Sequence, residues 1–276
     1  MKAVCVVGAS DTGKTSVVER LVSALDERGR VATVKPMHGD VRVDEEGKDT
    51  YRHREAGAER VVGVTPERRF DLSDVDDKTV SVAGTLDDLA DAGYDYSVVE
   101  GFEESSLPKI ATGDTEAPSV VLRDATDATT DELVDAVESA DEHETLGSLV
   151  RRAEDSDDSP RAGAVATFTG RVREENLDDA RTTRLEYEKY EAVADERMEA
   201  IRDDIEAREG VYEVEMYHET GVVRAEEDAV HVVVLAGHRA EAFRAVEDAI
   251  DRLKDEVPIF KKEVTEDGEF WVHDRP

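Results

Sequence analysis

One motif near the start of the chain limits the fold of its first half more than any other feature. Residues 8–15 read GASDTGKT and fit the pattern G-x-x-x-x-G-K-[ST] at every position. The apolar run at residues 2–7 predicts a buried strand before the motif, and residues 15–28 have the apolar spacing of a helix after it. A strand, a glycine-rich turn and a helix in this order are typical of a phosphate-binding loop in an α/β domain with a parallel sheet.

The residue types in this loop fit the binding of a nucleotide. Glycine allows backbone N–H groups to surround an anion, and the start of the helix adds the positive end of its dipole. We expect Lys14 to reach the β- and γ-phosphates, and the Thr15 hydroxyl and the Glu100 carboxylate to hold Mg²⁺. The predicted nucleotide-binding residues are Gly8, Ser10, Asp11, Thr12, Gly13, Lys14 and Thr15.

The remaining patterns predict two domains. Further strands of the first domain are predicted at residues 30–35, 79–82, 96–100 and 119–123, with helices at 86–92 and 131–140. Beyond a charged boundary region at 140–161, strands are predicted at residues 164–172, 182–187, 211–218, 229–235 and 260–264, with helices at 192–209 and 239–256. We therefore expect a P-loop NTPase-like α/β domain over residues 1–140 and an α+β domain over residues 141–276.

Composition restricts the functions open to this chain. Its 69 acidic and 35 basic residues give a formal charge of −34, which opposes binding to the phosphates of nucleic acids. Acidity along the whole chain, with Arg outnumbering Lys 25 to 10, favours a halophilic protein, because molar salt screens the self-repulsion. The single cysteine, Cys5, excludes a disulfide framework and a cysteine metal cluster. No apolar run reaches the roughly 18 residues of a membrane span, so we expect a cytoplasmic protein without a membrane partner.

Basic residues stand out in the acidic C-terminal half. Two arginines lie at the end of a predicted strand, a His-Arg pair lies where a strand meets a helix, and three lysines flank the turn at Pro258. Pooled positive charge of this kind binds a phosphate or polarises a carbonyl, and it makes a lysine a better nucleophile or base. The alternative is that the lysines only complement the dipole of a helix C-terminus. The residues concerned are Arg171, Arg173, His238, Arg239, Lys254, Lys261 and Lys262.

Four motifs of the first half occur together and in order. They are the phosphate-binding loop, KPMH at residues 35–38, GKDTYRHREAGA at 47–58 and VEGF at 99–102. Together they resemble the GTP-binding protein B of molybdopterin-guanine dinucleotide biosynthesis. The resemblance implies a domain that binds GTP with Mg²⁺, hydrolyses it weakly and assists the formation of the guanine dinucleotide cofactor.

Five motifs of the second half resemble the large catalytic subunit of molybdopterin synthase. They are AVATFTGRVREEN at residues 164–176, LEYEKY at 185–190, AGHRAEAF at 236–243, DRLKDEVPIFKKE at 251–263 and WVH at 271–273. The resemblance implies an α+β fold of the α/β hammerhead type that forms a homodimer and holds no tightly bound metal.

The same resemblance implies a reaction and its site. Cyclic pyranopterin monophosphate is converted to molybdopterin, with two sulfurs delivered as thiocarboxylates on the C-terminal Gly-Gly of a small ubiquitin-like sulfur carrier. Carried over to this sequence, Lys254 and Lys261 are the catalytic lysines. The implied substrate-binding residues are Arg171, Arg173, His238, Arg239, Lys262 and Glu263.

The prediction is therefore a fused enzyme of molybdenum cofactor biosynthesis, a sulfur transferase with a weak GTPase domain. A sulfur transferase that works through a persulfide needs a reactive cysteine, and Cys5 falls in a predicted buried strand, so the sulfur must arrive on another molecule. Two alternatives stay open. One is a docking scaffold for the sulfur carrier, and the other is a P-loop nucleotide kinase or NTPase of other specificity.

Overall fold

The computed structural model describes residues 1–37, 46–73, 82–175 and 180–271. The chain divides into an N-terminal unit of residues 2–88 and 94–142 and a C-terminal unit of residues 1, 89–93 and 143–276. The domain limits 1–140 and 141–276 stay a prediction. His38, His273 and the predicted strand residues 79–81 lie outside the described residues, and Val82 begins a helix.

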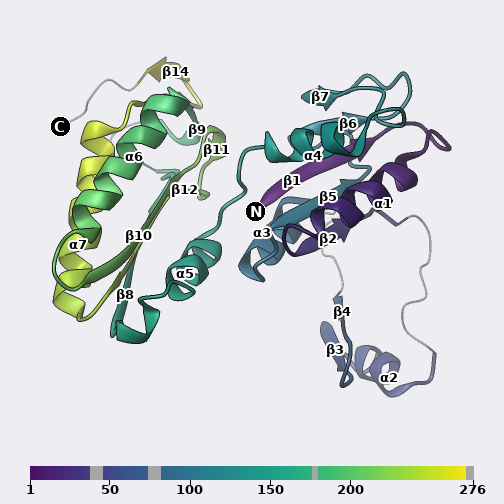
Figure 1. Ribbon diagram of the computed structural model, residues 1–276, viewed down its shortest axis with the longest axis horizontal. Coiled ribbons are helices and arrows are strands. Elements are labelled where there is room, and N and C mark those ends of the chain that lie inside the picture. Colours follow the sequence, from purple (N-terminus) through teal and green to yellow (C-terminus); the bar gives the residue numbers. More distant parts are fainter. Residues whose placement is uncertain (38–45, 74–81, 176–179, 272–276) are drawn as a thin grey trace. The chain divides into compact units, whose positions relative to one another are not determined.

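A five-stranded parallel sheet forms the centre of the N-terminal unit (Figure 1). Its order is β2–β5–β1–β6–β7, so the strand that leads into the glycine-rich loop is central. The strands are β1 (Lys2–Val7), β2 (Val31–Val34), β5 (Tyr96–Glu100), β6 (Lys109–Ala111) and β7 (Val120–Leu122). The helices of this part are α1 (Lys14–Leu25), α3 (Val82–Asp91) and α4 (Thr130–Glu138). The predicted parallel α/β class is confirmed.

The core of this sheet follows from its apolar spacing. Every residue of β1 after Lys2 is buried, which is the pattern of a parallel strand covered on both faces. Helix α1 buries Val17, Leu21 and Leu25 at four-residue spacing, and these side chains pack with α4 in one apolar cluster. The loop between β1 and α1 is therefore held at both ends by buried elements.

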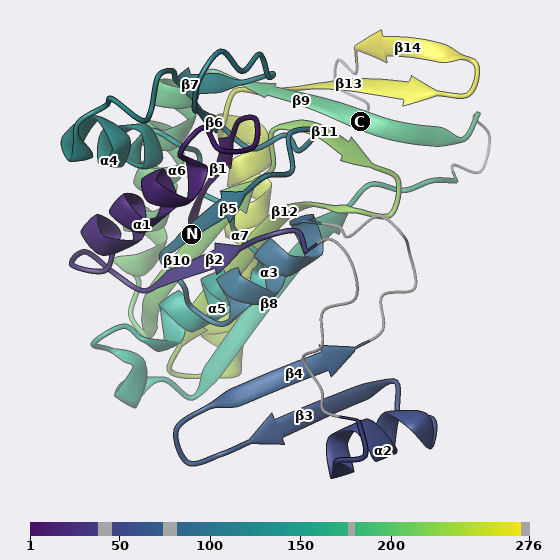
Figure 2. The ribbon, with the colours of Figure 1, turned by 90° about the vertical axis from the view of Figure 1, so that its right-hand side faces the viewer.

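Residues 46–73 contain three elements that the sequence patterns did not predict. Helix α2 (Asp49–Glu55) buries none of its residues, and β3 (Arg60–Val64) pairs with β4 (Arg69–Ser73) as an antiparallel hairpin (Figure 2). Apolar alternation in these strands is weak, because charged and exposed positions interrupt it.

Two antiparallel sheets form the C-terminal unit. The first has the order β10–β12–β8 and consists of β8 (Ala164–Arg171), β10 (Val211–His218) and β12 (Asp228–Ala236). The second has the order β11–β9–β13–β14 and consists of β9 (Thr182–Lys189), β11 (Gly221–Arg224), β13 (Ile259–Thr265) and β14 (Gly268–Trp271). Antiparallel sheets with separate helices confirm the predicted α+β class.

Helices cover both faces of the three-stranded sheet (Figure 1). Successive residues of β12 point to opposite faces, so Val232 and Val234 pack with α6 (Glu191–Glu206) and α7 (Arg239–Glu256), whereas Val233 and Leu235 pack with α5 (Leu146–Glu154). A short 3₁₀ turn at Ser159–Arg161 leads from α5 to β8. Helix α7 has the predicted bounds and ends before Pro258, which cannot continue it.

Candidate functional sites

The glycine-rich loop joins β1 to α1 and has the backbone of a phosphate-binding turn. Gly8, Asp11 and Gly13 have φ values of 156°, 63° and 88°. A Cβ atom on Gly8 would lie 2.1 Å from Oγ1 of Thr112, which follows β6, so only glycine fits there. The hydroxyls of Thr12 and Thr112 are 2.7 Å apart and fix the loop to the sheet.

The loop presents unpaired N–H groups to a ligand. In the part of the chain that the structure describes, the backbone N–H groups of residues 9–14 have no acceptor. The N-cap residue Gly13 offers no side-chain cap, and the first turn of α1 contains no acidic residue. Consecutive free N–H groups at the positive end of a helix form an anion site, so the loop fits a phosphate group.

Lys14 supplies the charge of this site. Its ammonium group donates to the carbonyl oxygens of Gly8 and Ala9 at 2.7 and 2.6 Å. The charge is therefore held over the loop by neutral acceptors. A phosphate bound at the loop offers it a stronger, charge-assisted hydrogen bond.

Glu100, the last residue of β5, brings a carboxylate to the edge of the sheet where Thr15 lies. The Thr15 hydroxyl is 3.5 Å from Oε1 of Glu100, whose side chain is only 11% exposed. Two oxygen donors beside a phosphate site suit Mg²⁺. Sequence reasoning gave no role to Lys35, yet its Nζ lies 2.8 Å from the same oxygen. The signal that could have identified it is its position after β2 in a chain with few lysines.

In the C-terminal unit, Lys254 lies in the last turn of α7. Its ammonium group is 5.6 Å from the centre of the Phe168 ring on β8, a cation–π contact. This contact places Lys254 beside β8, from whose end the chain continues to Arg173. Among the described residues Lys254 has no carboxylate partner.

Lys261 lies on β13 directly opposite Tyr187 of β9. The Tyr187 ring packs edge-on against His218, with 4.7 Å between the ring centroids. Burial, with a contribution from the Glu263 carboxylate, raises the pKa of Tyr187 to about 12. Burial also lowers the pKa of His218; a hydrogen bond to the Glu219 carbonyl opposes this, and the charge of Lys261 adds to it. Sequence reasoning assigned no role to this tyrosine or this histidine.

Alternation along β13 separates the two neighbouring lysines. Lys262 is paired with Glu269 at 2.8 Å and with Glu186 at 3.6 Å. Successive strand residues point to opposite faces, so Lys261 and Glu263 share one face and Lys262 lies on the other. The strand therefore brings Lys261 together with Glu263, and it keeps Lys262 apart from both.

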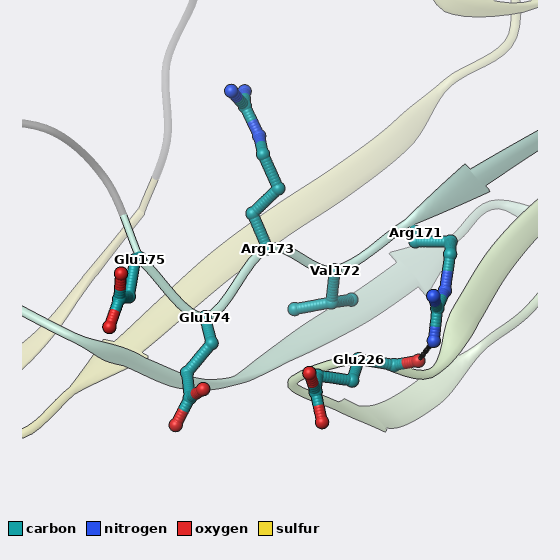
Figure 3. A pocket seen from close by; sticks show the side chains of 6 residues that line it. All are labelled: Arg171, Val172, Arg173, Glu174, Glu175 and Glu226. Atoms are coloured by element: carbon teal, nitrogen blue, oxygen red, sulfur yellow. Dashed lines mark hydrogen bonds between the residues drawn. The ribbon is translucent and has the colours of Figure 1, made fainter.

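The end of β8 borders a cavity of about 380 Å³ (Figure 3). It is lined by Arg171, Val172, Arg173, Glu174, Glu175 and Glu226. Arg171 pairs with Asp228 at 3.0 Å and donates to the carbonyl of Glu226, so its charge is engaged. Arg173 has no ion pair or hydrogen bond among the described residues, and Figure 3 shows its guanidinium extending away from the carboxylates of the lining. Arg173 is thus the arginine that is available to an anion.

His238 and Arg239 lie at the opposite end of α7 from Lys254. His238 is the N-cap residue and Arg239 the first residue of the helix, and both are exposed. About 15 residues separate Arg239 from Lys254, which is roughly 22 Å along a helix. A single copy of the chain does not bring this His-Arg pair to Lys254.

Cys5 does not form a reactive site. It is buried in β1, and its thiol donates to the carbonyl of Gly101 at 2.6 Å. Burial raises the pKa of the Cys5 thiol, although a hydrogen bond from Ser105 and the charge of Lys109 act in the other direction. A buried thiol of raised pKa is a poor nucleophile.

Two kinds of feature are absent from the described ranges, 1–37, 46–73, 82–175 and 180–271. Within these ranges, no group of three or more His, Cys, Asp or Glu side chains is arranged to hold a metal ion. No helix formed by the described residues combines the length and the apolar character needed to cross a membrane.

Comparisons with known proteins match each half of the chain separately and also the whole. The family model described as MoaE protein matches residues 140–256, and that of molybdopterin guanine dinucleotide synthesis protein B, MobB, matches residues 3–131. A probable molybdopterin synthase of Haloferax volcanii is 46% identical over 275 residues, which cover 98% of this chain and 99% of the relative.

Two further relatives match the C-terminal half. The molybdopterin synthase catalytic subunit of Pyrococcus abyssi is 37% identical over 133 residues, which cover 45% of this chain and 89% of the relative. The crystal structure of molybdopterin synthase from Staphylococcus aureus aligns with 39% identity and a TM-score of 0.39, covering 41% of this chain and 82% of that one.

Proposed function

The chain belongs to the molybdopterin synthase family, in a form that joins a MobB domain to a MoaE domain and acts in molybdenum cofactor biosynthesis, and from this premise we propose a reaction for each domain. The C-terminal domain converts cyclic pyranopterin monophosphate to molybdopterin with sulfur from a thiocarboxylated small carrier protein. The N-terminal domain binds GTP with Mg²⁺ and assists the formation of the guanine dinucleotide cofactor.

A set of unpaired cations carries the synthase proposal. The chain has about twice as many acidic as basic residues, so a cation without a carboxylate partner needs an explanation. Arg173, Lys254 and Lys261 form no ion pair with any described residue, and they lie at the end of β8, on α7 and on β13. The pterin phosphate and the carrier's thiocarboxylate are both anions, and the three charges suit them.

Each side chain has a role that follows from its chemistry. The planar guanidinium of Arg173 forms paired hydrogen bonds to a phosphate. Lys254 and Lys261 are the proposed catalytic lysines, which polarise the thiocarboxylate carbonyl as ammonium groups and take up protons as amines. Glu263 orients Lys261 from the same face of β13. Of the other predicted substrate-binding residues, Arg171 stabilises the lining of the cavity through its ion pair with Asp228 of β12. Lys262 adds positive charge from the opposite face of β13.

The sulfur comes from outside the chain. Cys5 is buried in the N-terminal sheet and its pKa is raised, so a persulfide on this chain is disfavoured. This supports a separate sulfur carrier as the partner.

A homodimer accounts for the predicted roles of His238 and Arg239. Within one chain they lie roughly 22 Å from Lys254 along α7. We propose that the C-terminal domain pairs with itself and that the His-Arg pair of one copy serves the phosphate pocket of the other.

The N-terminal proposal depends on the free N–H groups of the loop. Residues 9–14 offer donors to the phosphates, Lys14 offers charge, and Thr15 and Glu100 offer oxygens that would hold Mg²⁺. The bound ion would neutralise phosphate charge. Because GTP is an intracellular nucleotide, we place the protein in the cytoplasm.

Reconstitution tests the synthase proposal. The full chain, in molar salt, is mixed with cyclic pyranopterin monophosphate and a thiocarboxylated carrier, and the dithiolene pterin is measured. We expect product with the unaltered chain, and loss of product with retained binding of both ligands in Lys261→Ala. Binding of both ligands without any product from the unaltered chain would favour the docking scaffold instead. Transfer of phosphate from GTP to a small acceptor would favour the kinase alternative.

A further inference from the structure

The strand order fixes the direction in which a nucleotide extends from the loop. Ligands of parallel α/β sheets bind outside the carboxyl ends of the strands. In the proposed GTP site, Thr15 and Glu100 hold the Mg²⁺ side of the phosphates, and Glu100 lies on β5, on one side of β1. The base therefore extends to the other side of β1, over the ends of β6 and β7.

The loop after β7 is fixed against the phosphate-binding loop. The Thr126 hydroxyl donates to the carbonyl of Thr12 at 3.1 Å, and its methyl group lies 3.4 Å from where a Cβ on Gly13 would be. The next residue back, Ala125, is fully buried, and its N–H donates to the carbonyl of Ala111 at 3.0 Å. The backbone of this loop is thus held in a fixed position beside the phosphate-binding loop.

Asp124 presents its carboxylate from this fixed loop. Its φ of 51° is in the left-handed region, which is uncommon for a residue other than glycine and is tolerated best by Asn and Asp. Its carbonyl accepts the N–H of Asp127 at 2.9 Å, so the conformation is maintained by the turn. The side chain is exposed and has no hydrogen-bond or ion-pair partner among the residues described.

We propose that Asp124 selects guanine, an inference that rests on the proposed nucleotide site. The Watson–Crick edge of guanine presents two adjacent donors, N1–H and the N2 amino group, and one carboxylate accepts both. Adenine presents the lone pair of N1 at the same place, which a carboxylate repels. A single acidic side chain therefore favours GTP over ATP in two ways: it accepts hydrogen bonds from guanine, and it repels the N1 lone pair of adenine.

Asp114 also lies near this edge, and its position fits a base less well. It follows Gly113, where a Cβ would lie 3.3 Å from Cγ2 of Thr12 in the phosphate-binding loop. Asp114 directly follows a residue that packs on the loop, whereas Asp124 lies two residues before the loop contact of Thr126, and the phosphate charge would repel the nearer carboxylate more strongly. Asp124 follows β7, which is one strand farther from β1 than β6. This position suits the base, because the ribose would separate the base from the phosphates.

Nucleotide binding to the full chain tests this assignment. Affinities for GTP, ATP and XTP are measured in molar salt with Mg²⁺ for the unaltered chain and for Asp124→Asn. XTP has a carbonyl in place of the N2 amino group, and an asparagine amide can donate to it while accepting N1–H. We expect Asp124→Asn to weaken GTP binding by about 10- to 100-fold and to bind XTP more tightly than GTP. Asp127→Asn, three residues along the same turn, is the control and should leave both affinities unchanged.

The outcomes separate this inference from the function on which it rests. If the unaltered chain binds no nucleotide, the proposed GTP site itself is wrong. If it binds GTP and Asp124→Asn keeps the same preference, the assignment of Asp124 is overturned while the GTP site stands. A switch of preference in Asp114→Asn instead would overturn it as well. A gain of XTP binding supports the assignment, because a misfolded variant cannot gain a ligand.

Discussion

Lys35 and Glu100 form an ion pair in which Nζ lies 2.8 Å from Oε1, the same oxygen that faces the Thr15 hydroxyl at 3.5 Å. Two cations, the Lys35 ammonium and the proposed Mg²⁺, therefore compete for one carboxylate oxygen. Lys35 lowers the attraction of this carboxylate for a metal ion by neutralising part of its charge.

Removing the ammonium should make the metal bind more easily. We expect Lys35→Met to lower the Mg²⁺ concentration needed for half-maximal GTP binding about 3- to 10-fold, and Glu100→Gln to raise it by a similar factor. A Mg²⁺ titration of GTP affinity measures both. Lys2→Met, which removes a lysine paired with Glu138, is the matched control. A higher Mg²⁺ requirement in Lys35→Met would mean that Lys35 binds the phosphates itself.

Gly8 is a position where the phosphate-binding loop tolerates no side chain. A Cβ there would lie 2.1 Å from Thr112 Oγ1 and 2.9 Å from the Thr112 carbonyl oxygen, which belongs to the backbone and cannot turn aside. We expect Gly8→Ala to destabilise the chain by about 2–4 kcal/mol and to abolish GTP binding. Thermal melting and nucleotide binding measure the two effects. Gly84→Ala, in helix α3 with open space around its Cβ, should instead keep or raise the melting temperature.

The two lysines of β13 offer a test inside one strand. Lys261 shares a face with Glu263 and has no ion pair among the described residues, whereas Lys262 is paired with Glu186 and Glu269 on the other face. We expect Lys261→Ala to lower synthase activity at least about 100-fold and Lys262→Ala to lower it less than about 10-fold. Product formation in the reconstituted reaction measures both. Equal losses of synthase activity in the two variants would show that the face of β13 on which a lysine lies does not decide which lysine is catalytic.

Much of the fold could be predicted from local signals. The strands at residues 2–7, 96–100 and 211–218 and the helix at 239–256 have the predicted bounds, because each has a strong apolar period and a clear end. The strands β6, β11 and β14 were missed, since they have three or four residues and show no period. Their pairing with β1, β9 and β13 fixes them, and such long-range partners leave no local signal.

The sites were predicted less completely. A motif such as residues 8–15 keeps its geometry because the whole loop is contiguous in sequence. The partners Lys35 and Glu100 come from separate strands, so their contact depends on the sheet order. For the lysines of β13, the sequence shows that Lys261 and Lys262 point to opposite faces of the strand. Which face of the sheet each lysine occupies depends on the register with which β13 pairs with β9.

Two glutamates of the C-terminal unit should respond to pH in opposite directions. Burial raises the pKa of Glu213, and the carboxylates of Glu206 and Glu215 raise it further, despite two nearby arginines. Burial also acts to raise the pKa of Glu144, but a hydrogen bond from Ser148 and the charge of Arg152, 3.0 Å away, leave it lowered.

The sign of each effect follows from linkage between proton binding and folding. A raised pKa in the folded state means that ionising Glu213 opposes folding, so stability falls as pH rises from 4.5, the pKa of a free glutamate, through the folded pKa. Glu213→Gln removes that cost and should raise the free energy of unfolding at pH 7, with no gain below about pH 4. For Glu144 the lowered pKa stabilises the fold above pH 4.5, and this contribution is lost as pH falls through the folded pKa. Glu144→Gln should therefore destabilise the chain at pH 7, also because it leaves Arg152 without one partner. Urea unfolding of both variants at pH 7 and pH 4 in molar salt measures the four values, and a gain from Glu213→Gln that persists at pH 4 would contradict the ionisation argument.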